Sequence, residues 1–129
     1  RGDIKGITQK LDYFVDLGVN VLWLSPINKA GSYHGYDVQD YYSVSNKLGT
    51  EEDLKELIKE AHKKDIKILL DMVVNHTSNS HPWFVEASQY ANSKYRNYYV
   101  FKESGVQYGN SSNTSAGWYK NNNLELLNK

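Results

Sequence analysis

The sequence predicts an α/β fold with parallel strands, and three observations point to it. Two short apolar runs, residues 19–24 and 66–74, are typical of strands buried on both faces, as in parallel sheets. Amphipathic helical segments precede them, at residues 3–17 and 50–64. Each run also ends in a polar loop, and in parallel α/β barrels the functional sites lie at the carboxyl ends of the strands.

The first helix is expected over Asp3 to Leu17. Its apolar residues recur at helical spacing and form one stripe: Ile7, Leu11, Phe14 and Val15. Gly18 is placed to end this helix, and the strand at residues 19–24 follows it. A loop of roughly 24 residues then runs from Pro26 to Gly49, and loops of this length are usually functional or disordered. Its tyrosines favour a functional loop.

The second helix is expected to begin after Thr50. Thr50 is a predicted N-cap, with Asp53 in the capping-box position. Acidic residues crowd the first turn and lysines the last, which suits the helix dipole. Residues 19–74 therefore form a strand–loop–helix–strand unit, whose strands should be parallel and whose crossover should be right-handed.

The pattern changes near Ser78, where we expect a domain boundary. Residues 1–78 are predicted to be part of an α/β core, and residues 79–129 to be an irregular segment outside it. Within that segment, residues 82–90 are expected to form a short helix that Pro82 opens. Residues 95–101 have strand propensity.

The composition excludes several classes of function. Hydrophobic residues are 40% and charged residues 23%, which is typical of a globular protein. The 15 basic residues balance the 15 acidic ones, so no excess charge indicates nucleic acid or a membrane surface as a partner. Without cysteine, disulfide and thiol chemistry is excluded. The chain opens at Arg1 without a methionine, so we expect it to be part of a longer protein.

The most informative stretch is residues 71–78, Asp-Met-Val-Val-Asn-His-Thr-Ser. A buried strand seldom carries an aspartate such as Asp71, because an unpaired charge in a core is costly. It also seldom ends in Asn75 and His76 unless it delivers these side chains to a site. The stretch therefore predicts a functional site where the second strand ends.

Five segments together resemble the alpha-amylase family of glycoside hydrolases. They are residues 18–26 (second barrel strand), 34–41 (the loop after it), 49–54 (start of the next helix), 71–76 (the Asp-x-x-x-Asn-His block on the third strand) and 81–84. The last segment continues as in bacterial amylases and oligoglucosidases. The resemblance extends over residues 2–101, and the tail after Lys102 is expected to match nothing in the family.

The resemblance implies a (β/α)8 barrel with a small domain inserted after the third strand. A full barrel needs about 250 residues, so the chain would be only its N-terminal part. The implied activity is retaining hydrolysis of α-1,4 or α-1,6 bonds in α-glucans, which needs two carboxyl groups about 5–5.5 Å apart. Family transferases and isomerases share these motifs and remain open. The family's catalytic Asp and Glu residues lie on later strands, so we assign no catalytic residue here and expect the chain alone to be inactive.

The resemblance also implies three substrate contacts: Tyr36, His34 and His76. The family places the equivalent of Tyr36 under the sugar being cleaved, where a tyrosine face packs against a pyranose ring. His34 would line the same pocket. An imidazole such as that of His76 can hydrogen-bond sugar hydroxyls and stabilise charge in a transition state. The prediction requires Tyr36 and His76 to lie together.

Three further polar residues have predicted roles near this site. By the family pattern, Asp71 pairs with an arginine from a strand outside this chain and supports the site; alone, it would be a costly buried charge. Asn75 is a candidate Ca²⁺ ligand because calcium prefers oxygen donors, although related oligoglucosidases lack this metal. Asp37 is expected to fix its loop by binding backbone N–H groups.

Two other functions remain open at this point. A non-catalytic amylase-like barrel could serve as an interaction module, although such members typically lose the polar site residues that are present here. A nucleotide-binding α/β domain would need a glycine-rich phosphate loop, which neither strand has. The expected partners are an α-glucan or oligosaccharide and the remainder of the barrel. An open parallel sheet leaves exposed edges, through which the chain alone is expected to self-associate.

Overall fold

The computed structural model describes residues 2–99 and 124–126. The chain divides into two compact units, the first comprising residues 1–29 and 42–72 and the second residues 30–41 and 73–129. Over the described part of the chain, no helix has the length and apolar character needed to cross a membrane.

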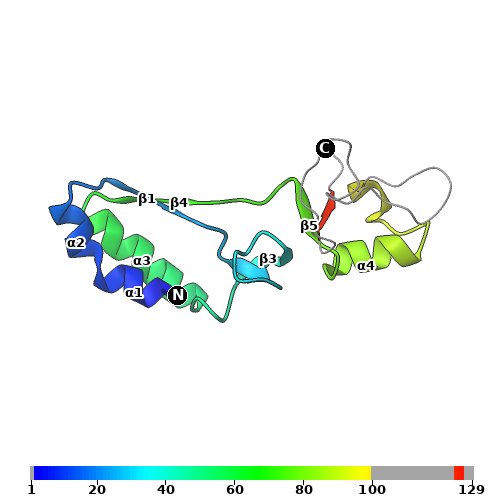
Figure 1. The fold of residues 1–129 in the computed structure, drawn as a ribbon, viewed down its shortest axis with the longest axis horizontal. Helices are drawn as coiled ribbons and strands as arrows, with labels where there is room; N and C mark the ends of the chain where they lie inside the picture. The colour runs from blue at the N-terminus through cyan, green and yellow to red at the C-terminus, as the bar shows by residue number, and fades with distance from the viewer. Residues whose placement is uncertain (1, 100–123, 127–129) are drawn as a thin grey trace. The chain divides into compact units, whose positions relative to one another are not determined.

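Two parallel strands form the sheet of the first unit (Figure 1). Strand β1 (Val21–Leu24) pairs with β4 (Lys67–Leu70), in a register that places Leu22 opposite Ile68. Helix α3 (Glu51–Lys63) precedes β4 in the chain. The predicted strand–helix–strand unit with parallel strands is therefore confirmed.

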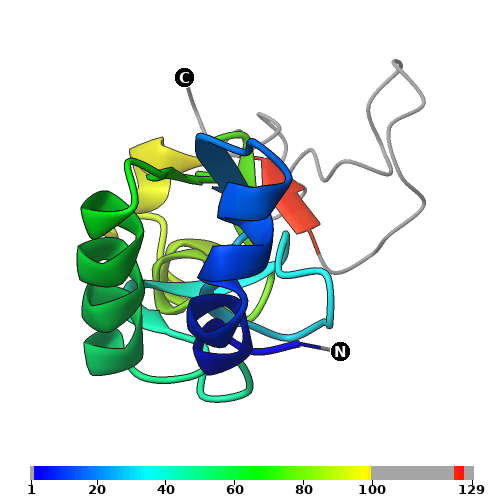
Figure 2. The same cartoon turned by 90° about the vertical axis from the view of Figure 1, so that its left-hand side faces the viewer.

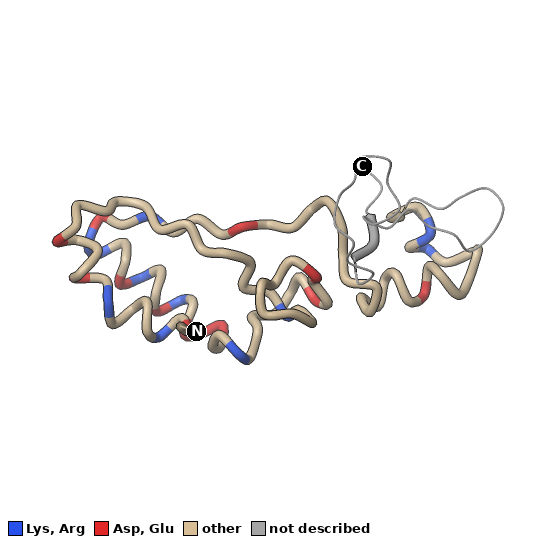
Figure 3. The backbone as a smooth tube through the Cα atoms, viewed as in Figure 1, with Lys and Arg blue, Asp and Glu red and all other residues tan. Residues whose placement is uncertain are grey.

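Helix α3 begins with the predicted capping box. The Thr50 hydroxyl accepts a hydrogen bond from the Asp53 N–H at 3.1 Å, and the Asp53 carboxylate accepts one from the Thr50 N–H at 2.9 Å. Basic and acidic residues are interspersed along the helix (Figure 3). Among them, Lys63 and Glu60 form an ion pair at 2.6 Å, but exposed pairs of this kind contribute little stability.

The N-terminal helix, expected as one element, is two short helices. Helix α1 (Ile4–Gln9) and helix α2 (Leu11–Asp16) are separated at Lys10, whose φ of −103° and ψ of 7° are not helical. The Lys10 N–H bonds to the carbonyl of Ile7, only three residues back, so the α-helical ladder closes there. Both short helices still contribute to the core, since Ile4 of α1 and Leu11 of α2 are buried in it.

The helices cover one face of the strand pair, with α1 and α3 side by side (Figure 1 and Figure 2). The buried core consists of Ile4, Leu11, Leu57, Ala61 and Ile66, and the inward strand residues Leu22, Leu24 and Ile68 pack against it. Alternate strand residues face away from it, and Trp23 is 71% exposed. The expectation of strands buried on both faces is wrong for the described chain, because no described element covers the second face.

Both strands are also shorter than expected. Residues 19–20 and 71–74 adopt no regular strand structure. Beyond β4, the Asp71 N–H still reaches the carbonyl of Leu24 at 3.0 Å, but the parallel ladder ends at Leu70. A strand continues only where a neighbour accepts its backbone hydrogen bonds, and β1 ends at Leu24.

The expected long loop contains two strands. Strand β2 (Asn28–Ala30) and strand β3 (Val38–Val44) pair in a two-stranded sheet. Residues 38–44 are rich in tyrosine and valine, which favour strands. Their apolar character is interrupted by polar residues on the same face, so no apolar alternation marked the strand in the sequence.

The second unit contains β5 (His76–Ser78), which pairs antiparallel with β6 (Leu124–Leu126), and helix α4 (Pro82–Gln89). The predicted helix that Pro82 opens is confirmed. Its N-cap is His81, whose Nδ1 accepts a hydrogen bond from the Trp83 N–H at 3.1 Å.

Residues 95–99 do not form the expected strand. They contain a 3₁₀ turn, η1 (Arg96–Tyr98), and residues 100–101 lie outside the described residues. The Arg96 guanidinium donates to the carbonyl of Ala87 at 2.7 Å, and Tyr99 packs with Phe84 in a small core. These contacts with α4 outweigh the local strand propensity. The domain boundary near Ser78 stays a prediction.

Candidate functional site

The site predicted at the end of the second strand centres on His76, within the second unit. His76 is only 8% exposed, and both ring nitrogens have partners. Its Nε2 lies 2.9 Å from the carbonyl oxygen of Tyr36, and its Nδ1 lies 3.2 Å from the amide nitrogen of Asn75. A carbonyl only accepts and an amide nitrogen only donates, so the proton is on Nε2. The predicted proximity of Tyr36 and His76 is confirmed.

The electrostatic surroundings keep this imidazole neutral. Burial lowers the pKa of His76 below 6.5, and His34 lowers it further. The Tyr36 carbonyl and the carboxylate of Asp37 act in the opposite direction without reversing the shift. At neutral pH, His76 therefore donates through Nε2 and accepts through Nδ1.

Aromatic rings gather on the loop that contains Tyr36. The ring centroids of His34 and Tyr36 are 5.9 Å apart, and those of Tyr33 and His34 are 5.5 Å apart. The Nδ1 of His34 accepts a hydrogen bond from the Tyr36 N–H at 3.1 Å, which ties the histidine to the loop. Tyr36 is 41% exposed, so part of its side chain is accessible to a ligand. The structure thus brings together the three predicted contacts His34, Tyr36 and His76.

Asp37 fixes the turn that presents these rings. Asp37 is 4% exposed, and its carboxylate accepts hydrogen bonds from the N–H of Ser32, at 3.1 Å, and from the Ser32 hydroxyl. A Cβ at Gly31 would come within 2.7 Å of the Asp37 carboxylate, so a side chain there would displace that carboxylate. The expectation that Asp37 binds a backbone N–H is confirmed.

Asn75 is half-buried, and its amide nitrogen is engaged with His76, which leaves the amide oxygen as its candidate metal donor. In the described ranges 2–99 and 124–126, no three His, Cys, Asp or Glu residues are grouped so that they could hold a metal. The assignment of Asn75 to a Ca²⁺ ion stays a prediction.

Asp71 lies in the first unit, directly after β4 and not inside a strand. It is half-buried, so the expected burial of its charge is wrong for the described chain. The reason is that the ladder ends at Leu70 and one face of the strand pair is uncovered. Its pairing with an arginine stays a prediction.

Sequence reasoning missed Tyr41 and Gln39, two residues of β3 that contact the site segment. The Tyr41 hydroxyl donates to the carbonyl oxygens of Val73, at 2.7 Å, and His76, at 3.1 Å. The Gln39 amide donates to the Ser80 hydroxyl at 3.0 Å. Residues 39 and 41 share one face of β3, and this spacing of two was the signal that could have found them.

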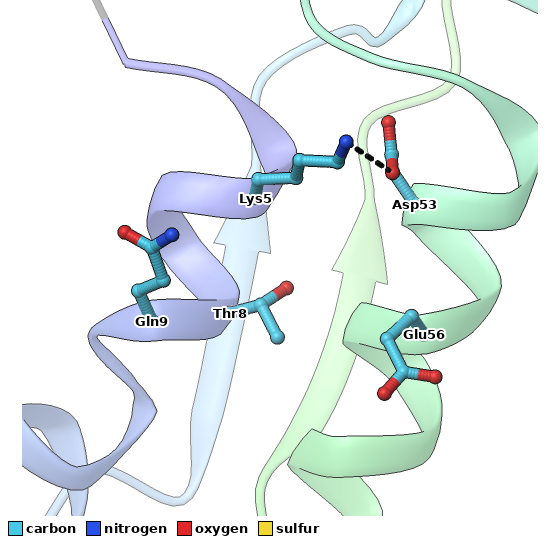
Figure 4. A pocket seen from close by; sticks show the side chains of 5 residues that line it. All are labelled: Lys5, Thr8, Gln9, Asp53 and Glu56. Carbon is cyan, nitrogen blue, oxygen red and sulfur yellow. Dashed lines mark ion pairs between the residues drawn. The ribbon is translucent and has the colours of Figure 1, made fainter.

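A shallow hollow lies between α1 and α3 in the first unit (Figure 4). Lys5 and Asp53 line it and form an ion pair at 3.5 Å, while the other carboxylate oxygen of Asp53 caps α3. The Lys5 ammonium and the Asp53 carboxylate already pair with each other, and Asp53 also caps α3. We therefore assign no ligand to the hollow.

Comparison with known proteins decides the family. The model of the alpha amylase catalytic domain matches residues 1–125. The chain belongs to the alpha-amylase family. It is 60% identical over 102 residues to Alpha-amylase SusG of Bacteroides thetaiotaomicron, covering 79% of this chain and 15% of that protein. It is 50% identical over 119 residues to Alpha-amylase 3 of Dictyoglomus thermophilum, covering 92% and 23%.

Solved structures agree with this assignment. The alpha-amylase from H. orenii superposes with a TM-score of 0.82 at 43% identity, over 98% of this chain and 30% of that one. The chain is thus an α/β part of the family's catalytic barrel, and it spans less than a third of the relatives that it matches. Family membership overturns the nucleotide-binding alternative. The match through residue 125 also corrects the expectation that the tail after Lys102 resembles nothing in the family.

Proposed function

We propose that the full-length protein is a retaining glycoside hydrolase that cleaves α-1,4 or α-1,6 glucosidic bonds in α-glucans. Family membership supports this, and the observation in this chain that carries it is the contact between His76 and Tyr36. Relatives of this chain include an oligo-1,6-glucosidase of Bacillus cereus, at 45% identity over 102 residues.

In this proposal, the chain contributes one wall of the sugar site. Tyr36 offers its ring as a stacking platform for a pyranose, and His34 lies beside it. Both nitrogens of His76 are engaged in this structure, so a sugar hydroxyl would replace either the Tyr36 carbonyl or the Asn75 amide. In the absence of a sugar, His76 holds the Tyr36 backbone in place.

The reactive groups would come from the rest of the protein. Retaining hydrolysis needs a nucleophilic carboxylate and a general acid, and we assign neither to this chain. We therefore expect this chain alone to bind sugar weakly and to hydrolyse nothing. In the full-length protein, the rest of the barrel would pair with the open edges of β1 and β4 in the two-stranded sheet; without it, the chain would self-associate there.

Three finer assignments are part of the proposal. The segment that follows β5 would begin a small domain inserted after the third barrel strand. Asn75 would contribute its amide oxygen to a Ca²⁺ ion whose other ligands come from elsewhere in the protein. Asp71 would pair with an arginine of another strand and support the site.

The test is hydrolysis of starch and of α-1,6-linked oligosaccharides by the full-length protein, with the Tyr36→Ala variant and a matched Tyr42→Ala control. Tyr42 is 83% exposed and lies outside the proposed site. Loss of a stacking platform worth about 1 kcal/mol or more should lower kcat/KM about tenfold in Tyr36→Ala, and the control should retain activity.

Two results would overturn the proposal. Absence of hydrolysis, with every α-glucosidic substrate, by a folded full-length protein would favour a non-catalytic barrel. Equal activity of the Tyr36→Ala and Tyr42→Ala variants would remove Tyr36 from the site.

A further inference from the structure

The segment that leads into β5, residues 71–75, has no regular secondary structure. Residues 71–74 form neither helix nor strand, and Asn75 is in a bend. Backbone carbonyls in such a segment need partners outside a regular ladder, particularly where they are buried. Val73 is 6% exposed and His76 is 8% exposed.

A single side chain contacts carbonyls on both sides of Asn75. The hydroxyl of Tyr41 lies 2.7 Å from the Val73 oxygen and 3.1 Å from the His76 oxygen, and its single proton is shared between these two acceptors. Because one oxygen atom bridges two carbonyls three residues apart, it restrains the path of the chain between them. The two ends of the segment cannot move apart without losing a hydrogen bond.

Tyr41 is itself held in place. It belongs to β3, and its ring stacks on that of Trp83, with centroids 5.8 Å apart and an angle of 24° between the planes. The Trp83 ring also stacks with Tyr95, at 6.0 Å. Burial, with a smaller contribution from Tyr99, raises the pKa of Tyr41 to about 12, so the phenol keeps its proton and remains a donor.

His76 is therefore hydrogen-bonded through both its ring and its backbone to the short stretch of residues 36–41. Its ring donates to the carbonyl of Tyr36, and its own carbonyl accepts from the hydroxyl of Tyr41. We propose that Tyr41 is a positioning residue of the sugar site: its hydroxyl clamps residues 73–76 so that the His76 ring meets Tyr36. The inference rests on the proposed function for its catalytic consequence, but the clamp is a property of the fold.

Other contacts hold β5 independently of this clamp. The hydroxyl of Thr77, which is fully buried, lies 2.9 Å from the hydroxyl of Tyr99. The Gln39 amide donates to Ser80 at 3.0 Å. Removal of the Tyr41 hydroxyl should therefore loosen residues 73–76 without unfolding the rest of β5.

The experiment uses the full-length protein with Tyr41→Phe and a matched control, Tyr42→Phe. The first substitution keeps the ring that stacks on Trp83 and removes only the hydroxyl; the second removes a hydroxyl from the next residue of β3, which is 83% exposed. Hydrogen–deuterium exchange of peptides covering residues 73–76 should be about tenfold faster in Tyr41→Phe and unchanged in Tyr42→Phe. Exchange in α3 should be unchanged in both.

Steady-state kinetics on an α-glucan then test positioning, at a temperature where both variants are fully folded. We expect kcat per folded molecule to fall about tenfold in Tyr41→Phe, with a smaller change in KM, and to be unchanged in Tyr42→Phe. A residue with only a structural role would lower the melting temperature and leave kcat unchanged.

The possible failures are distinguishable. Equal exchange in the two variants would overturn the clamp, and faster exchange with an unchanged kcat would overturn the positioning role. If the parent protein hydrolyses no α-glucan, the proposed function and the catalytic part of the inference both fail, while the exchange measurement still decides the clamp.

Discussion

The two units of this chain are stabilised in different ways. The buried core of the first unit is a layer of aliphatic residues between helices and strands, such as Leu11, Leu57 and Ile66. In the second unit, polar side chains such as Asp37, Thr77 and His81 are buried, and each has a hydrogen-bond partner. This difference in packing indicates which unit can hold a site of defined geometry. Apolar packing tolerates many sequences, whereas buried polar groups require specific partners and hold specific geometries.

The largest effect should come from the apolar core of the first unit. Leu57 is fully buried in α3, and Leu57→Ala should lower the free energy of unfolding by about 2–5 kcal/mol through lost burial and a residual cavity. Denaturant unfolding of the full-length protein measures this change, with hydrogen exchange of the α3 amides as the local readout. Leu17→Ala is the control, since Leu17 is 61% exposed. Similar losses in the two variants would contradict the packing account.

A smaller effect is expected from the polar core of the second unit. Thr77→Val keeps the shape of a fully buried side chain and leaves the Tyr99 hydroxyl without that partner, at a cost of about 1–3 kcal/mol. Tyr99→Phe should lower the free energy of unfolding less in the Thr77→Val variant than in the wild-type protein, because the variant has already lost the hydrogen bond between the two hydroxyls. A double-mutant cycle of unfolding free energies measures this coupling, and strict additivity would show that the two hydroxyls do not interact.

The smallest effect is a pH dependence at the start of α4. Burial lowers the pKa of His81 below 6.5, with partial opposition from Asp40, and the neutral ring caps the helix by accepting from Trp83. Because the folded pKa is depressed, this stability is fully present above pH 6.5 and is lost as the pH falls through the lower folded value.

Hydrogen exchange in α4 measured as a function of pH tests this prediction. The His81→Asn variant keeps a side chain suited to the N-cap but does not titrate there, so its exchange should lose the acid-dependent component. If the wild-type protein and the variant show the same pH dependence between neutral pH and pH 5, His81 is not responsible for it.

The sequence predicted those features whose signals are local. The Thr50–Asp53 capping box and the helix opened by Pro82 depend on residues within a few positions of one another, and the strands β1 and β4 were each predicted from one short apolar run. Strand β3 was missed because polar residues lie on both of its faces, so the sequence shows no apolar alternation there. The helix break at Lys10 was missed because neither proline nor glycine marks it.

The sequence by itself also determined the family and the candidate contacts, since motifs are read from residue identity and order. Only the tertiary structure decided that His76 donates to the Tyr36 carbonyl, that the Tyr41 hydroxyl contacts the Val73 and His76 carbonyls, and that residues 96–98 form a turn and not a strand. The physical reason is range: caps and periodicity act within a turn or two, whereas these contacts join residues far apart in the chain. Their partners become neighbours only when the chain folds, and a buried polar group then takes the partner that lies within reach.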